Sequence, residues 1–527
     1  MPELQPIYVA GQWRAADSTG TFQAANPATG ETLPDVFPIS AWPDCDAALT
    51  AASAAFAELQ SLPPARIAEF LRAFATKIEA QAEALCATAN RETGYPIKPR
   101  LAEAELPRTV NQLRQAADAA EEGSWQNVVI DSKQNIRSHL TALGPVVVFG
   151  PNNFPFAFGS ASGGDFAAAI AAGCPVVAKA NTSHPATTKL FMEAAAAALA
   201  ETKLPPATVQ LIYRTSHADG ERLVADPRVG AVAYTGSRHA GLKLKAAADA
   251  VGKPIYVELS SINPVVFLPG ALAERAEKLV DEFVGSCLMG TGQFCTNPGL
   301  LVLLKGEATD AFLAAAGKKF SAAPAGALLS SGVADSLRRG VEVLQQAGAT
   351  VVAESDAVTQ PGFRCPNTLL RVSASQFIKN SHALQTECFG NESLAVVADD
   401  LPQLLSVLDQ LEGNLTGCIY SDTTGKDDAH YAPIAAKLRL RVGRLLNDKM
   451  PTGVAVTAAM NHGGPFPATG HPAFTAVGIP AAVKRFGMLA CYDAVREPRL
   501  PAALQNKNPT GKMWRSIDGN WSQGDVA

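Results

Sequence analysis

Short apolar runs alternate with alanine-rich, helix-favouring stretches along most of the chain, and this alternation restricts the possible folds more than any other feature. The runs are rich in β-branched residues and bounded by Gly or Pro, which is typical of buried parallel strands. They are Pro145–Phe149, Val176–Ala178, Val209–Ile212, Val229–Tyr234, Ile255–Leu259 and Val265–Leu268. Helices are expected between them at Ser160–Ala172, Thr187–Leu199, Gly220–Ala225 and Arg238–Ala250. The spacing predicts a doubly wound sheet, which binds ligands beyond the carboxyl ends of its strands.

A second alternating region, from about residue 271 to residue 459, predicts a second α/β domain. Its helices are expected at Ala271–Leu288, Thr309–Phe320 and Val333–Ala347. Before the first sheet, the sequence predicts a hairpin over Ile7–Phe22 and a mostly helical stretch over Asp44–Val110 that breaks at Pro63-Pro64. The polar tail after Pro498 predicts an irregular surface or subunit-contact segment.

Charge and cysteine spacing exclude several classes of protein. A net charge of -5 argues against a nucleic-acid or anionic-membrane partner. No apolar run approaches the roughly 18 residues of a membrane span, and no secretion signal is visible, so we expect a cytoplasmic protein. The nine cysteines include no CxxC pair, and His residues at metal-binding spacing are absent, so neither a disulfide framework nor a metal is expected.

Common phosphate-binding and hydrolase motifs are also absent. The sequence contains no Walker A motif, no GxSxG and no HExxH. The nearest match to the dinucleotide fingerprint GxGxxG is Gly290-Thr-Gly292-Gln-Phe-Cys295, which ends in Cys and follows a helix rather than a strand. This near match places Cys295 in a Gly-rich turn, where a backbone N–H and a ligand can approach the sulfur closely.

Three further features accompany Cys295. Glu258 ends an apolar strand, at the position where α/β folds keep their active sites. Asn153 follows another strand and offers a carboxamide donor, and Thr235-Gly236-Ser237 leads from a strand into a helix whose free amides suit a phosphate. Each feature has an ordinary alternative on its own: a buried loop cysteine, a solvated acid, an Asn-rich turn or a simple helix start.

Together, in this order and spacing, these motifs resemble the aldehyde dehydrogenase superfamily over nearly the whole chain. The shared motifs include Gly11-Gln12-Trp13, Asn26-Pro27-Ala28-Thr29-Gly30, Asn153-Phe154-Pro155, Lys179, Thr235-Gly236-Ser237, Glu258-Leu259 and Glu387-Cys388-Phe389-Gly390. Gly292–Gly299, Ser260–Pro264, Pro451-Thr452-Gly453-Val454 and His462-Gly463-Gly464-Pro465 are similar to one branch of it. That branch holds the NADP-linked α-ketoglutaric semialdehyde (2,5-dioxovalerate) and long-chain aldehyde dehydrogenases.

The resemblance implies a catalytic role for three residues. Cys295 would be the nucleophile that adds to the aldehyde, and Asn153 with the Cys295 N–H would bind the oxyanion. Glu258 would activate the water that hydrolyses the resulting thioester, which favours release of an acid over transfer to coenzyme A.

The resemblance also implies a nicotinamide cofactor. Lys179 would bind the adenosine ribose, Gly236 and Ser237 the pyrophosphate, and Glu387 with Phe389 the nicotinamide ribose. Relatives that prefer NAD often carry a Glu where this chain has Thr182, and Arg214 offers a charge nearby, so NADP is expected over NAD. The branch often has an Arg where this chain has His217.

The expected fold is two doubly wound αβα domains with a small β oligomerisation element. Residues 1–122 and 145–258 would form the coenzyme-binding domain, 123–144 an oligomerisation hairpin, 259–470 the catalytic domain and 471–527 a C-terminal return that contacts another subunit. A homodimer or homotetramer is therefore expected.

The expected reaction is oxidation of α-ketoglutaric semialdehyde to 2-oxoglutarate. Phe156 and Phe466 would line an apolar pocket or belong to the core, and His462 would be an accessory polar group or a structural histidine. One alternative is a dehydrogenase of long-chain aliphatic or aromatic aldehydes. A remote alternative is a non-catalytic protein on the same fold.

Overall fold

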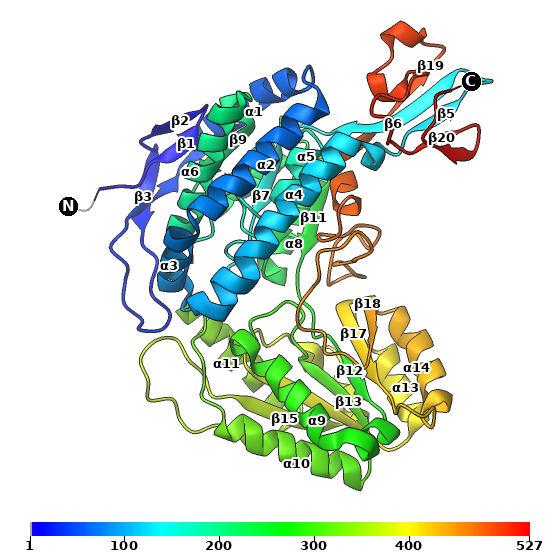
Figure 1. Ribbon diagram of the computed structural model, residues 1–527. Coiled ribbons are helices and arrows are strands. Elements are labelled where there is room, and N and C mark those ends of the chain that lie inside the picture. Colours follow the sequence, from blue (N-terminus) through cyan, green and yellow to red (C-terminus); the bar gives the residue numbers. More distant parts are fainter. Residues whose placement is uncertain (1–2, 527) are drawn as a thin grey trace.

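The structure, a computed structural model, describes residues 3–526 and contains two large sheets (Figure 1). The first sheet has the order β11-β10-β7-β8-β9-β1-β2. Five consecutive strands of it are parallel, namely β7 (Val146–Phe149), β8 (Val176–Lys179), β9 (Val209–Ile212), β10 (Ala231–Thr235) and β11 (Ile255–Glu258). The short strands β1 (Ile7–Val9) and β2 (Gln12–Arg14) extend it antiparallel at one edge. The predicted doubly wound sheet is confirmed.

Eight helices bury one continuous core against the first sheet, and the last four of them alternate with its parallel strands. They are α1 (Trp42–Leu59), α2 (Pro64–Ala80), α3 (Ala82–Thr93), α4 (Leu106–Glu122), α5 (Gly164–Ala171), α6 (Pro185–Thr202), α7 (His217–Ala225) and α8 (Arg238–Asp249). The break predicted at Pro63-Pro64 is confirmed, because Pro64 begins α2. No helix among residues 3–526 has the length and apolarity that a membrane crossing demands.

The second sheet has the order β14-β15-β16-β13-β12-β17-β18. Its strands are β12 (Val265–Phe267), β13 (Leu300–Leu304), β14 (Thr350–Glu354), β15 (Thr368–Ser373), β16 (Glu392–Ala398), β17 (Asn414–Tyr420) and β18 (Val442–Asn447), all parallel except β14. The accompanying helices are α9 (Pro269–Leu288), α10 (Glu307–Ala322), α11 (Ser331–Gln346), α12 (Ala374–Lys379), α13 (Leu401–Asp409) and α14 (Asp428–Arg439). Two separate cores pack against this sheet, so it is covered on both faces.

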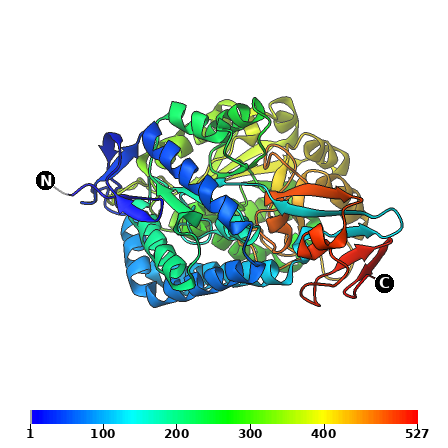
Figure 2. The ribbon, with the colours of Figure 1, turned by 90° about the horizontal axis from the view of Figure 1, so that it is seen from above.

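A third sheet projects from the body as an arm (Figure 1 and Figure 2). It has the order β19-β6-β5-β20-β21, formed by β5 (Val129–Asp131), β6 (Ile136–Ala142), β19 (Gly487–Asp493), β20 (Arg515–Ile517) and β21 (Asn520–Ser522). The hairpin predicted within residues 123–144 is thus part of a larger sheet. The tail after Pro498 is not wholly irregular, because it contributes β20 and β21.

The N-terminal prediction was also partly wrong. The hairpin ends at Arg14, because β1 pairs with β2, whereas β3 (Ser18–Phe22) pairs with β4 (Phe37–Ser40) in a sheet of its own. The pattern over Ile7–Phe22 did not distinguish one hairpin from two short strands that leave toward different partners.

Candidate active site

The candidate site begins at the carboxyl ends of the first sheet's strands. In the parallel register, Thr235 of β10 is opposite Glu258 of β11, and Phe149 of β7 is opposite Lys179 of β8. The turns that follow these strands therefore meet at one edge of the sheet, as a doubly wound fold requires of a ligand site.

Cys295 reaches this edge on a tight turn between α9 and β13. Thr291 and Gly292 adopt positive φ values of +59° and +70°. A Cβ on Gly292 would lie 1.9 Å from the carbonyl oxygen of Gly390, so only glycine fits there. The Gly-rich sequence thus allows the turn to pack directly against the segment before β16.

Asn263 holds the Cys295 turn in place. Its Nδ2 donates hydrogen bonds to the carbonyl oxygens of Cys295 and Asn297, each at 2.9 Å. Asn263 is itself fixed by Asn414 of β17, whose Oδ1 accepts from the Asn263 backbone N–H at 3.1 Å. Asn263 is completely buried. In the sequence, Asn263 belongs to the Ser260–Pro264 motif, which indicated no role for this side chain.

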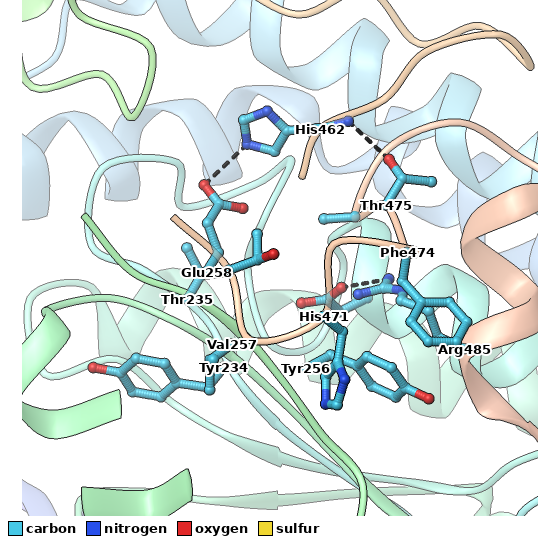
Figure 3. A pocket seen from close by; sticks show the side chains of 13 residues that line it. Tyr234, Thr235, Tyr256, Val257, Glu258, His462, His471, Phe474, Thr475 and Arg485 are labelled. Carbon is cyan, nitrogen blue, oxygen red and sulfur yellow. Dashed lines mark hydrogen bonds and ion pairs between the residues drawn. The ribbon is translucent and has the colours of Figure 1, made fainter. Parts of the chain in front are cut away.

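His462 connects the cysteine to the glutamate. Its Nε2 lies 3.5 Å from Cys295 Sγ and 2.9 Å from Glu258 Oε1. Thr475 Oγ1 accepts from the His462 backbone N–H at 2.8 Å, which fixes the loop that carries the ring (Figure 3). Glu258 and His462 are both buried, and a single ring nitrogen faces both partners. A proton on Nε2 can therefore be given to only one partner at a time.

The surroundings of Cys295 favour the neutral thiol. Burial raises the pKa of Cys295 well above its usual value, and the negative charge of Glu258 raises it further. The charge of Arg108 acts in the opposite direction. Formation of a thiolate thus depends on proton transfer to a neighbouring base, and the Glu258–His462 pair is within reach.

Asn153 lies beside the same turn. Its Nδ2 donates to the carbonyl oxygen of Gln293 at 3.0 Å, two residues before Cys295. Arg100 Nη2 donates to the Asn153 carbonyl at 3.1 Å. The structure therefore brings together Asn153, Glu258 and Cys295, although Asn153 is 105 positions before Glu258 and Glu258 is 37 positions before Cys295 in the chain.

A buried carboxylate orders the segment that follows Asn153. Glu105 Oε1 accepts hydrogen bonds from the backbone N–H groups of Phe156 and Ala157, at 2.8 and 3.0 Å. Its other oxygen lies 3.4 Å from Arg100 Nη2. Glu105 and Arg100 both belong to the helical segment Ile97–Glu105 that precedes α4. This segment therefore fixes the backbone of Asn153 and of the residues that follow it.

The residues expected to bind a cofactor fall into two groups. Lys179, Thr182, Arg214, Gly236 and Ser237 follow neighbouring strands at the edge of the first sheet. Burial, with the charge of Arg214, lowers the pKa of Lys179 to about 8. The Ser237 hydroxyl caps α8 by accepting from the Ala240 N–H at 3.4 Å.

Glu387 and Phe389 form the second group, next to the Cys295 turn. Both line a small pocket that also includes Ser261, Gly292 and Phe294. Glu387 Oε1 accepts from the Ser261 N–H at 3.2 Å. Burial raises the pKa of Glu387 to about 8.

Three of these side chains also form a group that could hold a metal ion. Ligand atoms of Glu258, Cys295 and His462 all lie within 4.8 Å of one another. Sulfur, imidazole nitrogen and carboxylate oxygen are donors that zinc accepts. The sequence could not reveal this set, because the three residues share no local spacing.

The apolar wall near Cys295 differs from the one expected. Phe156 lies in the core, fully buried, with its ring 5.2 Å from Phe191. Phe466 is 54% exposed and sits over Arg238 at 5.7 Å. Of the two roles expected for them, Phe156 thus has the core role, whereas Phe466 has neither, because its side chain faces solvent.

A different cluster forms that wall. It contains Phe154, Ala157, Phe158, Phe294 and Val477, with Val454, Val456 and Met460 packed against it. The Phe158 ring lies 5.7 Å from the His462 ring. Sequence analysis missed this cluster and two arginines beside it, Arg108 and Arg444, for which no motif gave a signal.

Comparisons with known proteins agree with this geometry. The aldehyde dehydrogenase family matches residues 13–464. The chain is 40% identical to alpha-ketoglutaric semialdehyde dehydrogenase 2 of Azospirillum brasilense, over 96% of this chain and 98% of that protein. It is 34% identical to the alpha-ketoglutaric semialdehyde dehydrogenase of Acinetobacter baylyi, over 98% of each.

Solved structures share the fold. Lactaldehyde dehydrogenase from Escherichia coli superposes with a TM-score of 0.79 at 23% identity, over 93% of this chain and 99% of that one. A PnpE structure in complex with nicotinamide adenine dinucleotide superposes with a TM-score of 0.80 at 21% identity, over 94% and 99%. With a family match across most of its length, this chain belongs to the aldehyde dehydrogenase family.

Proposed function

We propose that this protein oxidises α-ketoglutaric semialdehyde to 2-oxoglutarate with NADP as the preferred cofactor. The observation that carries the chemistry is the contact of His462 Nε2 with both Cys295 and Glu258, beside the Asn153 carboxamide. The substrate is supported by the two relatives whose names state it, at 40% and 34% identity over nearly their full lengths.

The first half of the reaction uses Cys295 as nucleophile. The thiol gives its proton to the Glu258–His462 pair, and Sγ adds to the aldehyde carbon. The resulting oxyanion is stabilised by the Asn153 side chain and the Cys295 N–H, and each such donor contributes about 2.7–4 kcal/mol. Collapse of this adduct expels hydride with its electron pair and leaves a thioester on Cys295. A nicotinamide cofactor, when bound, accepts that hydride.

The second half uses Glu258 as a base. After the proton taken from the thiol has passed to solvent, Glu258 removes a proton from water, the hydroxide adds to the thioester carbonyl, and Cys295 leaves as a thiolate. His462 orients the carboxylate through its hydrogen bond to Oε1. Because hydrolysis consumes water, the product is the free acid.

The residues at the sheet edge fit an anionic cofactor. Lys179 and Arg214 carry like charges close together, and within residues 3–526 neither forms a salt bridge with a carboxylate. A phosphate would relieve that repulsion. Thr182 adds a hydroxyl donor and no negative charge, so we assign this edge to the phosphate-bearing ribose of NADP, with NAD as the weaker cofactor. Ser237 would hold the pyrophosphate and Glu387 the nicotinamide ribose.

We assign residues 1–122 and 145–258 to the coenzyme-binding domain and 259–470 to the catalytic domain. The arm, formed by β5, β6, β19, β20 and β21, would join subunits into a dimer or tetramer. Its edge strand β19 exposes Met488 and Leu489 by 54% and 67%, which is unusual for large apolar side chains outside an interface. The cytoplasmic location stays a prediction.

A panel of aldehydes tested with NAD and NADP distinguishes the candidates. The proposal expects the highest kcat/KM for α-ketoglutaric semialdehyde with NADP. The aromatic wall of Phe154, Phe158 and Phe294 favours a second candidate, the oxidation of long-chain aliphatic or aromatic aldehydes. A higher kcat/KM for such aldehydes would establish that candidate instead. Absence of activity with every aldehyde would leave only the non-catalytic alternative.

A further inference from the structure

Two arginines near the thiol have no carboxylate partner. Arg108 is on α4 and Arg444 is on β18, so the two large domains each contribute one of them. Neither forms a salt bridge within residues 3–526, whereas Arg100, Arg238 and Arg485 each pair with a carboxylate. Their hydrogen bonds go only to neutral groups.

Both guanidinium groups bind the same loop. Arg108 Nη1 donates to the carbonyl of Val454, and Arg444 Nη2 donates to those of Pro451 and Gly453 at 3.0 and 3.2 Å. This contact leaves other donors free. Arg108 Nε and Nη2, together with Arg444 Nε, are buried without a hydrogen-bond partner.

The two arginines flank the aromatic wall. The Arg108 guanidinium lies 5.3 Å from the centre of the Phe158 ring, and Phe158 in turn lies 5.7 Å from His462. Arg444 Nη1 is 3.6 Å from Sδ of Met460, which packs on the same wall. Each charge also acts on Cys295, since each is among the groups that interact electrostatically with its thiol.

A buried cation without an anion is unfavourable. Desolvation of a guanidinium costs several kcal/mol unless a counter-charge and hydrogen bonds compensate. Burial lowers the pKa of Arg108, the charge of Glu105 partly opposes this, and the charges of Arg100 and Arg444 lower the pKa further. Carboxylates bind guanidinium groups through paired hydrogen bonds, and such a ligand would use the free Arg108 donors.

We propose that Arg108, supported by Arg444, binds the carboxylate of an ω-carboxylated aldehyde whose carbonyl carbon reacts at Cys295. This inference rests on the proposed function and specifies which residues select the acid-bearing substrate. A five-carbon chain spans only about 5 Å between its end carbons. Phe158 links the two positions, since its ring centre lies 5.3 Å from the Arg108 guanidinium and 5.7 Å from the ring of His462, whose Nε2 contacts the thiol.

The test compares two aldehydes of equal length, 5-oxopentanoate and pentanal. Selectivity is the ratio of their kcat/KM values, measured with NADP for the wild-type protein and for Arg108→Gln. We expect the substitution to lower this ratio about 10- to 100-fold, chiefly through a higher KM for 5-oxopentanoate. Arg108→Lys retains the charge without the paired donors, and it should keep part of the selectivity.

Arg114→Gln is the matched control, because Arg114 lies on the same helix and pairs with Glu79 at the surface, with Nη2 2.7 Å from Oε2. The control should leave the selectivity ratio unchanged. An equal loss for both aldehydes in Arg108→Gln would overturn the proposal and assign Arg108 to the loop or the thiol. Unchanged selectivity in Arg108→Gln would overturn it as well.

Failure of the proposed function gives a different result. If the wild-type protein itself prefers pentanal, the acid-bearing substrate is wrong, whatever Arg108 does. If Arg108→Gln does not fold, Arg108→Lys is the test. A selectivity ratio below that of the wild type would support the proposal, and a ratio identical to that of the wild type would overturn it, because the paired guanidinium donors would then not be needed.

Discussion

His462 Nε2 lies 2.9 Å from Glu258 Oε1, and this hydrogen bond links the proposed base to the thiol on the other side of the ring. The same nitrogen is 3.5 Å from Cys295 Sγ. A proton on Nε2 can therefore pass to either neighbour. Thr475 Oγ1 accepts a hydrogen bond from the backbone N–H of His462, which holds the loop that carries the ring.

Replacing His462 should change the pH range over which the Cys295 thiol reacts. His462→Phe removes the link to Glu258, and we expect kcat to fall about 10- to 100-fold. The pH profile of Cys295 alkylation by iodoacetamide should shift as well, which a purely structural role would not cause. His462→Gln retains a donor and should recover part of both effects. An unchanged alkylation profile in His462→Phe would remove His462 from the mechanism.

Substitutions of Cys295 and of Glu258 should block different steps of the reaction. Cys295→Ser should lose at least about 1,000-fold in aldehyde-dependent NADPH formation, because a serine hydroxyl is a far weaker nucleophile. Glu258→Gln should release about one NADPH per site in a rapid burst and then stall as the thioester. Rapid-mixing absorbance measurements separate the two. Cys491→Ser, at an exposed cysteine of β19, serves as the control. A steady rate without a burst in Glu258→Gln would exclude Glu258 as the hydrolytic base.

The tight turn before Cys295 should tolerate no side chain at Gly292. Gly292→Ala would place a Cβ 1.9 Å from the Gly390 carbonyl oxygen, so the turn must move and kcat should fall more than about 100-fold. Gly252→Ala is matched in backbone strain, since Gly252 has φ +68° but nothing within 4 Å of an added Cβ. Equal activities of the two variants would show that the turn is not constrained by this contact.

Thr182 should set the cofactor preference. Thr182→Glu places a carboxylate where we assign the NADP phosphate, so the KM for NADP should rise about 100-fold. The KM for NAD should stay within a few-fold of the wild-type value. Steady-state kinetics with both cofactors measures the ratio. Equal effects on NAD and NADP would place the phosphate elsewhere.

Glu387 should make stability depend on pH. Burial raises its folded pKa to about 8, whereas the unfolded value is near 4.5. The folded state therefore holds a proton that the unfolded state has lost over this range, and stability falls as pH rises from about 4.5 to 8. Glu387→Gln should raise Tm relative to wild type by about 2–4 °C more at pH 8 than at pH 5. The exposed Glu342→Gln is the control, and an equal difference at both pH values would contradict the assignment.

The sheet and its ligand edge could be predicted because local patterns suffice for them. Strands of the first sheet are continuous apolar runs, and the parallel register then brings Asn153, Lys179, Ser237 and Glu258 to one edge. Cys295 was identifiable from its glycines. These features depend on the chain within a few residues or on a general rule of doubly wound folds.

The rest of the site depends on long-range packing, which no local pattern records. Arg108 and Arg444 meet only because α4 and β18 approach the same loop. Phe156 and Phe158 are two residues apart, yet one points into the core and the other toward His462. The path of the backbone after Asn153 decides the direction of each ring. Glu105, which ends the helical segment before α4, fixes that path through its hydrogen bonds to the backbone.

The arm joins distant parts of the chain, and this has a consequence for biosynthesis. Residues 136–142 pair with 487–493, and the buried Arg515 binds carbonyl groups of Gln505 and Gly524. A nascent chain has made both large sheets long before these last residues leave the ribosome, so the arm folds last. In the oligomer that we propose, subunits would therefore join through the arm only after these residues have been made.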